Sequence, residues 1–141
     1  MTKNKPKYQR NPQGLSDKSA KPKKIVFSFE MLDRNQGQSF EEWQTHNILA
    51  LLCEKLAGIS KLSVEEAKRE QIIKEYPVFP TKTEFTHPKH VPDDVLWASM
   101  HIQGKECVIG YFETNIFYIV FLDKEHEFWK TDLQDRNKIK R

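Results

Sequence analysis

Histidine and lysine side chains in this 141-residue chain have the chemistry needed to cleave a phosphodiester. Cutting RNA without a metal requires a base for the 2′-hydroxyl, an acid for the leaving oxygen and cations that stabilise the phosphorane. Histidine suits both proton transfers because its pKa lies near neutrality. We select His101, Lys105 and His126 as candidate catalytic residues, since each lies in or beside the apolar carboxy-terminal third of the chain.

A second group of residues has the chemistry to hold the RNA. Lys82, Lys89 and His90 lie in a proline-rich stretch just before that apolar third, where their charges would meet phosphates. Trp129 follows the last apolar segment and could stack on a base, with packing against the rest of the domain as the alternative. For every single histidine or lysine, the plain alternative is a solvated surface residue.

Other chemistries find weaker support in the sequence. His87 and His90 have a spacing found in some metal sites, but no ligand signature is complete. Further ligands could come from His101, Cys107 and His126, so a structural zinc site is the alternative to the expected absence of a metal. The five glycines form no phosphate-binding loop, so we expect no cofactor. Cys107 alternates with apolar residues, which favours a buried thiol over a nucleophile.

The candidate residues depend on three short apolar segments for their positions. The segments LWASMHIQ, ECVIGYF and IFYIVFL follow one another with gaps that hold turn formers, Gly104 in the first and Thr114-Asn115 in the second. Gaps this short cannot contain a parallel crossover, so they predict a three-stranded antiparallel meander. His101 and Lys105 would then face each other across the first turn, with His126 just past the last strand.

The preceding residues predict the remaining elements. Apolar alternation predicts a strand over 25–32, and a capping box at Ser39 starts a helix that ends at Gly58. A second capping box at Ser63 predicts a helix to about residue 76, paired with the first as a helical hairpin. Four prolines make 77–93 a long irregular loop. The predicted fold is α+β: strand, helical hairpin, then antiparallel three-stranded meander.

The net charge of +3 is unevenly distributed along the chain. The first 24 residues carry eight Lys or Arg and one acid, whereas the remainder carries 15 Lys or Arg and 19 acids. We therefore predict a disordered basic arm over 1–24, a single domain over 25–131 and a frayed charged tail over 132–141. Such an arm either gathers phosphate backbone or keeps the protein soluble.

Location is also constrained by composition. The longest apolar run, 116–122, is too short to cross a bilayer, and no secretory signal is visible. The two cysteines have no paired spacing, as is usual for free thiols in a reducing compartment. We expect a cytoplasmic protein with no membrane partner.

At this point the sequence resembles a known family. The element order is similar to that of the RelE/ParE-like toxin superfamily, and GKECVIGYFETNIFYIVFLDKEHEFW resembles the closing hairpin of RelE-like toxins. In those toxins an RIIGF segment, a loop, an FYVVFLDPDH segment and an aromatic residue recur. The resemblance covers about residues 24–130, and its most specific part is Asp123-x-x-His126-x-Phe128.

The resemblance implies a small toxin that cleaves mRNA without a metal, often on the ribosome, and is neutralised by a cognate antitoxin protein. One departure concerns Cys107, which stands where the related pattern often has arginine. Lys105 would have to supply the missing cation. ParE-like members act on DNA gyrase instead, so a second hypothesis is a non-catalytic RelE-fold binding module for RNA or a protein partner.

Overall fold

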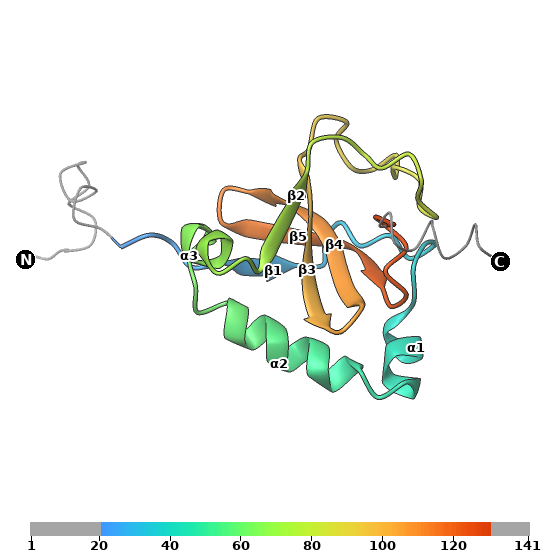
Figure 1. Cartoon of the computed structure of the whole chain (residues 1–141), viewed down its shortest axis with the longest axis horizontal. Coiled ribbons are helices and arrows are strands. Elements are labelled where there is room, and N and C mark those ends of the chain that lie inside the picture. The colour runs from blue at the N-terminus through green and yellow to red at the C-terminus, as the bar shows by residue number, and fades with distance from the viewer. Residues whose placement is uncertain (1–20, 131–141) are drawn as a thin grey trace, which may run out of the picture.

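The computed structural model describes residues 21–130, which form an α+β domain (Figure 1). Most of the predicted basic arm and the predicted tail, at residues 1–20 and 131–141, lie outside the described residues. The elements follow in the order β1 (Val26–Ser28), α1 (Phe40–Thr45), α2 (Leu49–Ile59), α3 (Val64–Arg69), β2 (Ile73–Tyr76), β3 (Trp97–Gln103), β4 (Glu106–Glu113) and β5 (Ile116–Asp123). In the described chain, no helix is both long and apolar enough to traverse a bilayer.

Within the described residues the sheet has five strands, in the order β1-β5-β4-β3-β2. Strands β3, β4 and β5 are antiparallel neighbours, as the short gaps between their segments predicted. The predicted α+β class and the antiparallel meander are confirmed, but the meander is only part of the sheet, because β2 and β1 extend it at its two edges. Strand β2 pairs antiparallel with β3, whereas β1 pairs parallel with β5, which makes the sheet mixed.

Strand β2 replaces the second half of a predicted helix. The capping box starts α3 as expected: Ser63 Oγ accepts from the Glu66 amide at 3.1 Å, and Glu66 Oε1 accepts from the Ser63 amide at 2.9 Å. The helix ends at Arg69, and Gln71 adopts a left-handed φ of 62°. The next residues, led by β-branched Ile73, then pair with the exposed edge of β3.

The first predicted helix is divided in two. Ser39 caps α1 by accepting from the Glu42 amide at 3.0 Å. Asn47 then adopts a φ of 62°, which separates α1 from α2. Gly58 does not end α2, which continues to Ile59. Residues 21–130 therefore contain three short helices rather than a helical hairpin.

The predicted strand over 25–32 is also shorter than expected. Ser28 Oγ accepts from the Glu30 amide at 3.1 Å, and the Leu32 amide donates to the Phe29 carbonyl at 3.1 Å. These bonds close a turn, so β1 ends at Ser28. A serine hydroxyl that bonds to a nearby amide competes with continued strand pairing.

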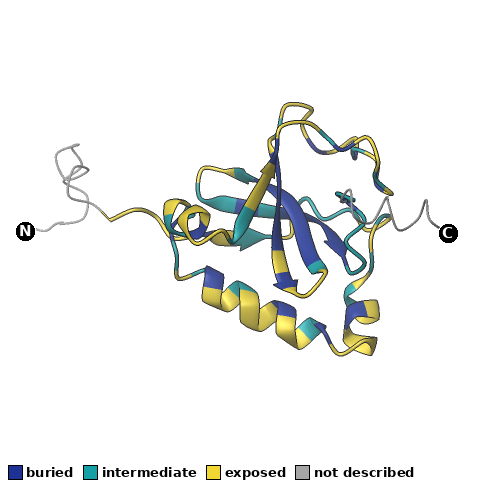
Figure 2. Ribbon diagram, in the orientation of Figure 1, coloured by how far each residue is buried: buried dark blue, intermediate teal, exposed yellow. Residues whose placement is uncertain are grey.

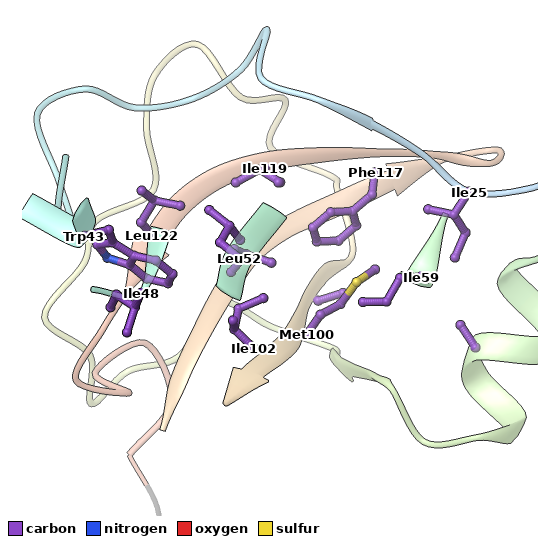
Figure 3. Close-up of a cluster of buried hydrophobic side chains, with 13 residues drawn as sticks. Ile25, Trp43, Ile48, Leu52, Ile59, Met100, Ile102, Phe117, Ile119 and Leu122 are labelled. Carbon is purple, nitrogen blue, oxygen red and sulfur yellow. The ribbon is translucent and has the colours of Figure 1, made fainter. Parts of the chain in front are cut away.

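Each face of the sheet has its own buried cluster, and the central strands are buried almost throughout (Figure 2). The helix-covered face packs against Trp43, Leu52 and Ile59 (Figure 3). The loop-covered face carries Trp97 and Phe121, and residues 77–93 and the segment after β5 lie over it. Residues 77–93 contain neither helix nor strand, as the prolines predicted.

Strands β4 and β5 approach closely at Gly110. The register between them shifts between Ile109 and Gly110. A Cβ atom at Gly110 would lie 1.8 Å from the Tyr118 carbonyl oxygen. This position therefore requires glycine, because the obstacle is backbone that cannot rotate away.

Candidate functional site

Two of the three predicted catalytic side chains, His101 and His126, lie face to face. Their ring centroids are 5.2 Å apart and their planes differ by 28°. His101 lies on β3, on the same face as Trp97, because residues two apart on a strand point the same way. His126 lies just after β5, so the fold joins histidines that are 25 positions apart in the sequence. We call them the histidine pair.

A buried carboxylate shapes the turn that carries His126. Asp123 is 1% exposed, and its two carboxylate oxygens accept from the Glu127 and Phe128 amides, each at 2.8 Å. Within this turn, residues 123–128, His126 adopts a left-handed φ of 59°. Phe128, 1% exposed, anchors the far end in the aromatic cluster. The Asp-x-x-His-x-Phe spacing thus has a structural meaning: the aspartate folds the turn and the phenylalanine fixes it.

The long loop holds the same turn from outside. The Glu127 carbonyl accepts from Thr83 Oγ1 at 3.2 Å and from the Glu84 amide at 3.3 Å. Lys130 adds an ion pair with Glu84. The loop 77–93 therefore acts as a support for the His126 turn, in addition to covering the sheet.

Two lysine charges, those of Lys74 and Lys55, act on His101. Partial burial lowers the pKa of His101 below its ordinary value, and the charges of His126, Lys74 and Lys55 lower it further. The ring of His101 is therefore mainly neutral near pH 7. Sequence reasoning missed Lys74, because it was placed in a predicted helix. The four residues of β2 do not alternate apolar with polar, so no local signal marked Lys74 as part of a strand.

The third predicted catalytic residue, Lys105, has a different partner. It lies in the turn between β3 and β4, where Nζ donates to Glu125 Oε1 at 2.6 Å. The other Glu125 oxygen accepts from Lys124 at 2.7 Å. These two lysines lower the pKa of Glu125 to about 2, and Glu125 in turn raises the pKa of Lys105. The Lys105 charge is thus partly neutralised one residue away from His126.

Cys107 lies buried below the histidine pair. It is the cross-strand partner of His101 on one side and of Asp123 on the other. Its Sγ is 3.8 Å from the Asp123 carbonyl oxygen. Burial, with the nearby Asp123 charge, raises the pKa of the Cys107 thiol far above its usual range. The side chain is therefore a neutral core thiol and supplies no positive charge to the site.

The predicted RNA-binding residues fall into two groups. Lys82, Lys89 and His90 are exposed on the long loop, where His90 Nε2 contacts the Met31 carbonyl oxygen at 2.8 Å. Trp129 lies instead on the segment after β5, three residues after His126. Its ring stacks on Tyr76 with centroids 4.9 Å apart.

No group of three or more His, Cys, Asp or Glu side chains within residues 21–130 is arranged to hold a metal ion. His87 and His90 have a spacing found in some metal sites, but the His87 ring packs against Phe79 and Trp97. Its Nδ1 contacts the Pro88 carbonyl oxygen at 3.0 Å. His87 and His90 therefore face different partners.

The description of the histidine pair and of the turn 123–128 comes from the structure of this chain alone. Comparisons with protein-family models, with curated proteins and with solved structures found no match to this chain, so the interpretation of the site rests on that geometry.

Proposed function

We propose that this protein is a toxin of the RelE-like type, an endoribonuclease that cleaves mRNA without a metal. The observation that carries the proposal is the histidine pair, with ring centroids 5.2 Å apart and with the charges of Lys74 and Lys55 acting on His101. Two imidazoles at this separation can reach the entering and the leaving oxygen of one phosphorus atom. The cognate antitoxin, the ribosome and a cytoplasmic location belong to the same proposal.

His101 is assigned the role of base. Its lowered pKa keeps the ring neutral near pH 7, so a ring nitrogen can accept the proton of the 2′-hydroxyl. The 2′-oxygen then attacks phosphorus, and the bond from phosphorus to the 5′-oxygen breaks. His126 donates a proton to that departing oxygen. The products are a 2′,3′-cyclic phosphate and a free 5′-hydroxyl, and the two histidines have exchanged protonation states.

Lys74 is assigned the stabilisation of negative charge on the phosphorane. Its ammonium acts electrostatically on His101, and its strand pairs with β3 beside the histidine. A cation fixed near the non-bridging oxygens stabilises the transition state more than the substrate, because charge accumulates there during attack. This assignment supplies the positive charge that Cys107 lacks. Lys105 stays a secondary candidate because Glu125 binds it.

The test combines growth with RNA cleavage. We expect expression of the full chain in a bacterium to arrest growth and to cut mRNA, and His101→Gln and His126→Gln to abolish both effects. His46→Gln is the matched control, because His46 is an exposed histidine at the end of α1. A wild-type protein that neither arrests growth nor cuts RNA, with or without ribosomes, contradicts the proposal.

The second candidate is a non-catalytic RelE-fold module that binds RNA or a protein partner. The neutral, buried thiol at Cys107 favours it, because a cation was expected at this position. On this alternative, both histidine variants bind the partner as the wild type does. Deletion of residues 1–24 then removes binding, with a steep salt dependence if the partner is a nucleic acid.

A further inference from the structure

An aromatic stack lies at the edge of the sheet beside the histidine pair. Tyr76, the last residue of β2, is 4% exposed, and its hydroxyl bonds to Ser99 Oγ at 2.9 Å. The edge of its ring contacts Phe128, with centroids 5.5 Å apart. The Trp129 ring stacks on the Tyr76 ring, with ring centroids 4.9 Å apart and an angle of 29° between the ring planes. Tyr76 is thus held in place by several contacts and fixes the plane of Trp129.

Trp129 itself remains partly open to solvent. It is half-buried, whereas Tyr76 below it and Phe128 before it are buried. An indole that stacks on one aromatic ring and stays partly exposed offers surface on which a planar group can stack. Trp129 differs in this respect from Trp97, Phe121 and Phe128 of the same aromatic cluster, which are buried.

Lys74 connects this platform to the histidine pair. Its Nζ lies 5.6 Å from the centre of the Tyr76 ring. On the strand it is the partner of Ser99, which lies two residues before His101 on the same face. The same ammonium therefore lies near the aromatic stack and acts on His101. An aromatic ring, a cation and two imidazoles on neighbouring segments are the groups that could bind the base, the phosphate and the sugar hydroxyl of a nucleotide.

We propose that Trp129, supported by Tyr76, is a stacking subsite for one nucleobase of a single-stranded nucleic acid, with Lys74 binding the phosphate beside that base. The inference rests on the proposed function, since it places the substrate of the histidine pair. It also specifies that substrate. The base must be unpaired and unstacked to reach the indole, and every base is accepted because each has a π face.

Binding can be tested separately from cleavage. The probe is a short, fluorescently labelled 2′-O-methyl oligonucleotide, which lacks the attacking hydroxyl and cannot be cut by this chemistry. Its dissociation constant is measured with the full-length protein, both wild type and with His101→Gln and His126→Gln combined. Trp129→Leu should weaken binding roughly 10-fold or more, the loss expected for one base–aromatic stack. Trp129→Phe should restore most of the affinity, because it keeps an aromatic face.

Two further measurements separate recognition from packing. An oligonucleotide series with a single abasic position should include one member that loses affinity for the wild type but not for Trp129→Leu. Lys74→Gln should reduce the slope of log affinity against log salt by about 0.7, the value for one lost phosphate contact on a single strand. Thermal denaturation of each variant identifies losses that arise from unfolding.

The outcomes divide clearly. Trp129-dependent binding without cleavage by the wild type refutes the nuclease and keeps the subsite. Cleavage with Trp129→Leu binding as tightly as the wild type refutes the subsite and keeps the nuclease. Equal losses for Trp129→Leu and Trp129→Phe, matched by lowered Tm, mean that the stack is only packing and overturn the inference. Failure of every oligonucleotide to bind overturns it as well.

Discussion

Replacing Gly110 with alanine tests how β4 and β5 fit together. The added Cβ atom would lie 1.8 Å from the Tyr118 carbonyl oxygen, 2.9 Å from its carbon and 3.2 Å from the Ile119 Cα. Ordinary contacts of a Cβ atom begin at 3.4 Å, so the shortest of these must lengthen by about 1.6 Å. All three obstacles are backbone atoms of the neighbouring strand. The strain can be relieved only by moving one strand away from the other.

The magnitude follows from what that movement breaks. A separation of this size opens the ladder bonds beside Gly110, and we count two buried groups left without partners at about 1–3 kcal/mol each. Displacing the well-packed core around them costs about 1–3 kcal/mol more. The expected loss is therefore about 3–9 kcal/mol, against a total stability of about 5–15 kcal/mol for a domain. The variant should be unfolded or close to it.

Thermal unfolding followed by circular dichroism measures this loss. Gly110→Ala should lower Tm by at least about 12 °C, using about 4 °C per kcal/mol for a domain of this size. Gly58→Ala is the matched control, because nothing lies within 4 Å of its added Cβ on α2. It should raise stability by about 0.5–1 kcal/mol, since alanine suits a helix better. A Gly110→Ala protein that melts within about 3 °C of the wild type refutes the close approach of β4 and β5.

Four other predictions concern the site and its surroundings. Asp123→Ala removes the acceptor of the buried Phe128 amide and of the partly buried Glu127 amide. Urea denaturation should show a loss of about 2–4 kcal/mol in the free energy of unfolding, and an unchanged midpoint would contradict the role of the carboxylate in the turn. In the native protein a thiol reagent should label the exposed Cys53 but not the buried Cys107, with both labelled after denaturation; two labelled thiols before denaturation would exclude a buried Cys107. The pKa of Glu125 is lowered to about 2, so its stabilising contribution is complete above its ordinary pKa of 4.5 and is lost as the pH falls toward 2. Glu125→Gln should therefore flatten the dependence of the free energy of unfolding on pH between these two values. An unchanged dependence would argue against the contacts of Glu125 with the two lysines. The pKa of His101 measured by NMR titration should lie below 6.5, and a value above it would remove the assignment as base.

Local signals predicted the elements that are specified by short stretches of sequence. The gaps at Gly104 and Thr114 could hold only tight turns, so the pairing of β3, β4 and β5 followed from their length. Both serine caps were found because a capping box joins residues only three apart. Prolines excluded regular structure from residues 77–93 for an equally local reason, the missing amide hydrogen.

Elements that depend on a distant partner were missed. Strand β2 exists because β3 offers it a free edge, and residues 73–76 alone do not show that edge. Asn47 and Gln71 end their helices with a positive φ, where no glycine or proline marks the break. The pairing of β1 with β5 is a tertiary contact that no nearby residue specifies.

The site also combines residues that local sequence indicated with residues that only the tertiary structure reveals. His101 and His126 were chosen from residue type and from their places beside the predicted strands, and the fold brings their rings together. Lys105 was chosen on the same grounds, yet Glu125 is its partner, because the turn after β5 also carries acids. Lys74 could not be recognised until β2 was known to be a strand. The role of Asp123 required the backbone amides of a turn that the sequence does not display.

The parallel pairing of β1 with β5 has a consequence for how the protein is synthesised. Val26 is the partner of Ile116, so the first strand must wait until the last has been translated before it can join the sheet. The turn that presents His126 follows β5 directly. A nascent chain that lacks this last strand thus has an incomplete sheet and only one of the two histidines. We therefore expect completion of the fold and assembly of the histidine pair to occur together, late in synthesis, and a contact so distant along the chain to be a slow step in folding.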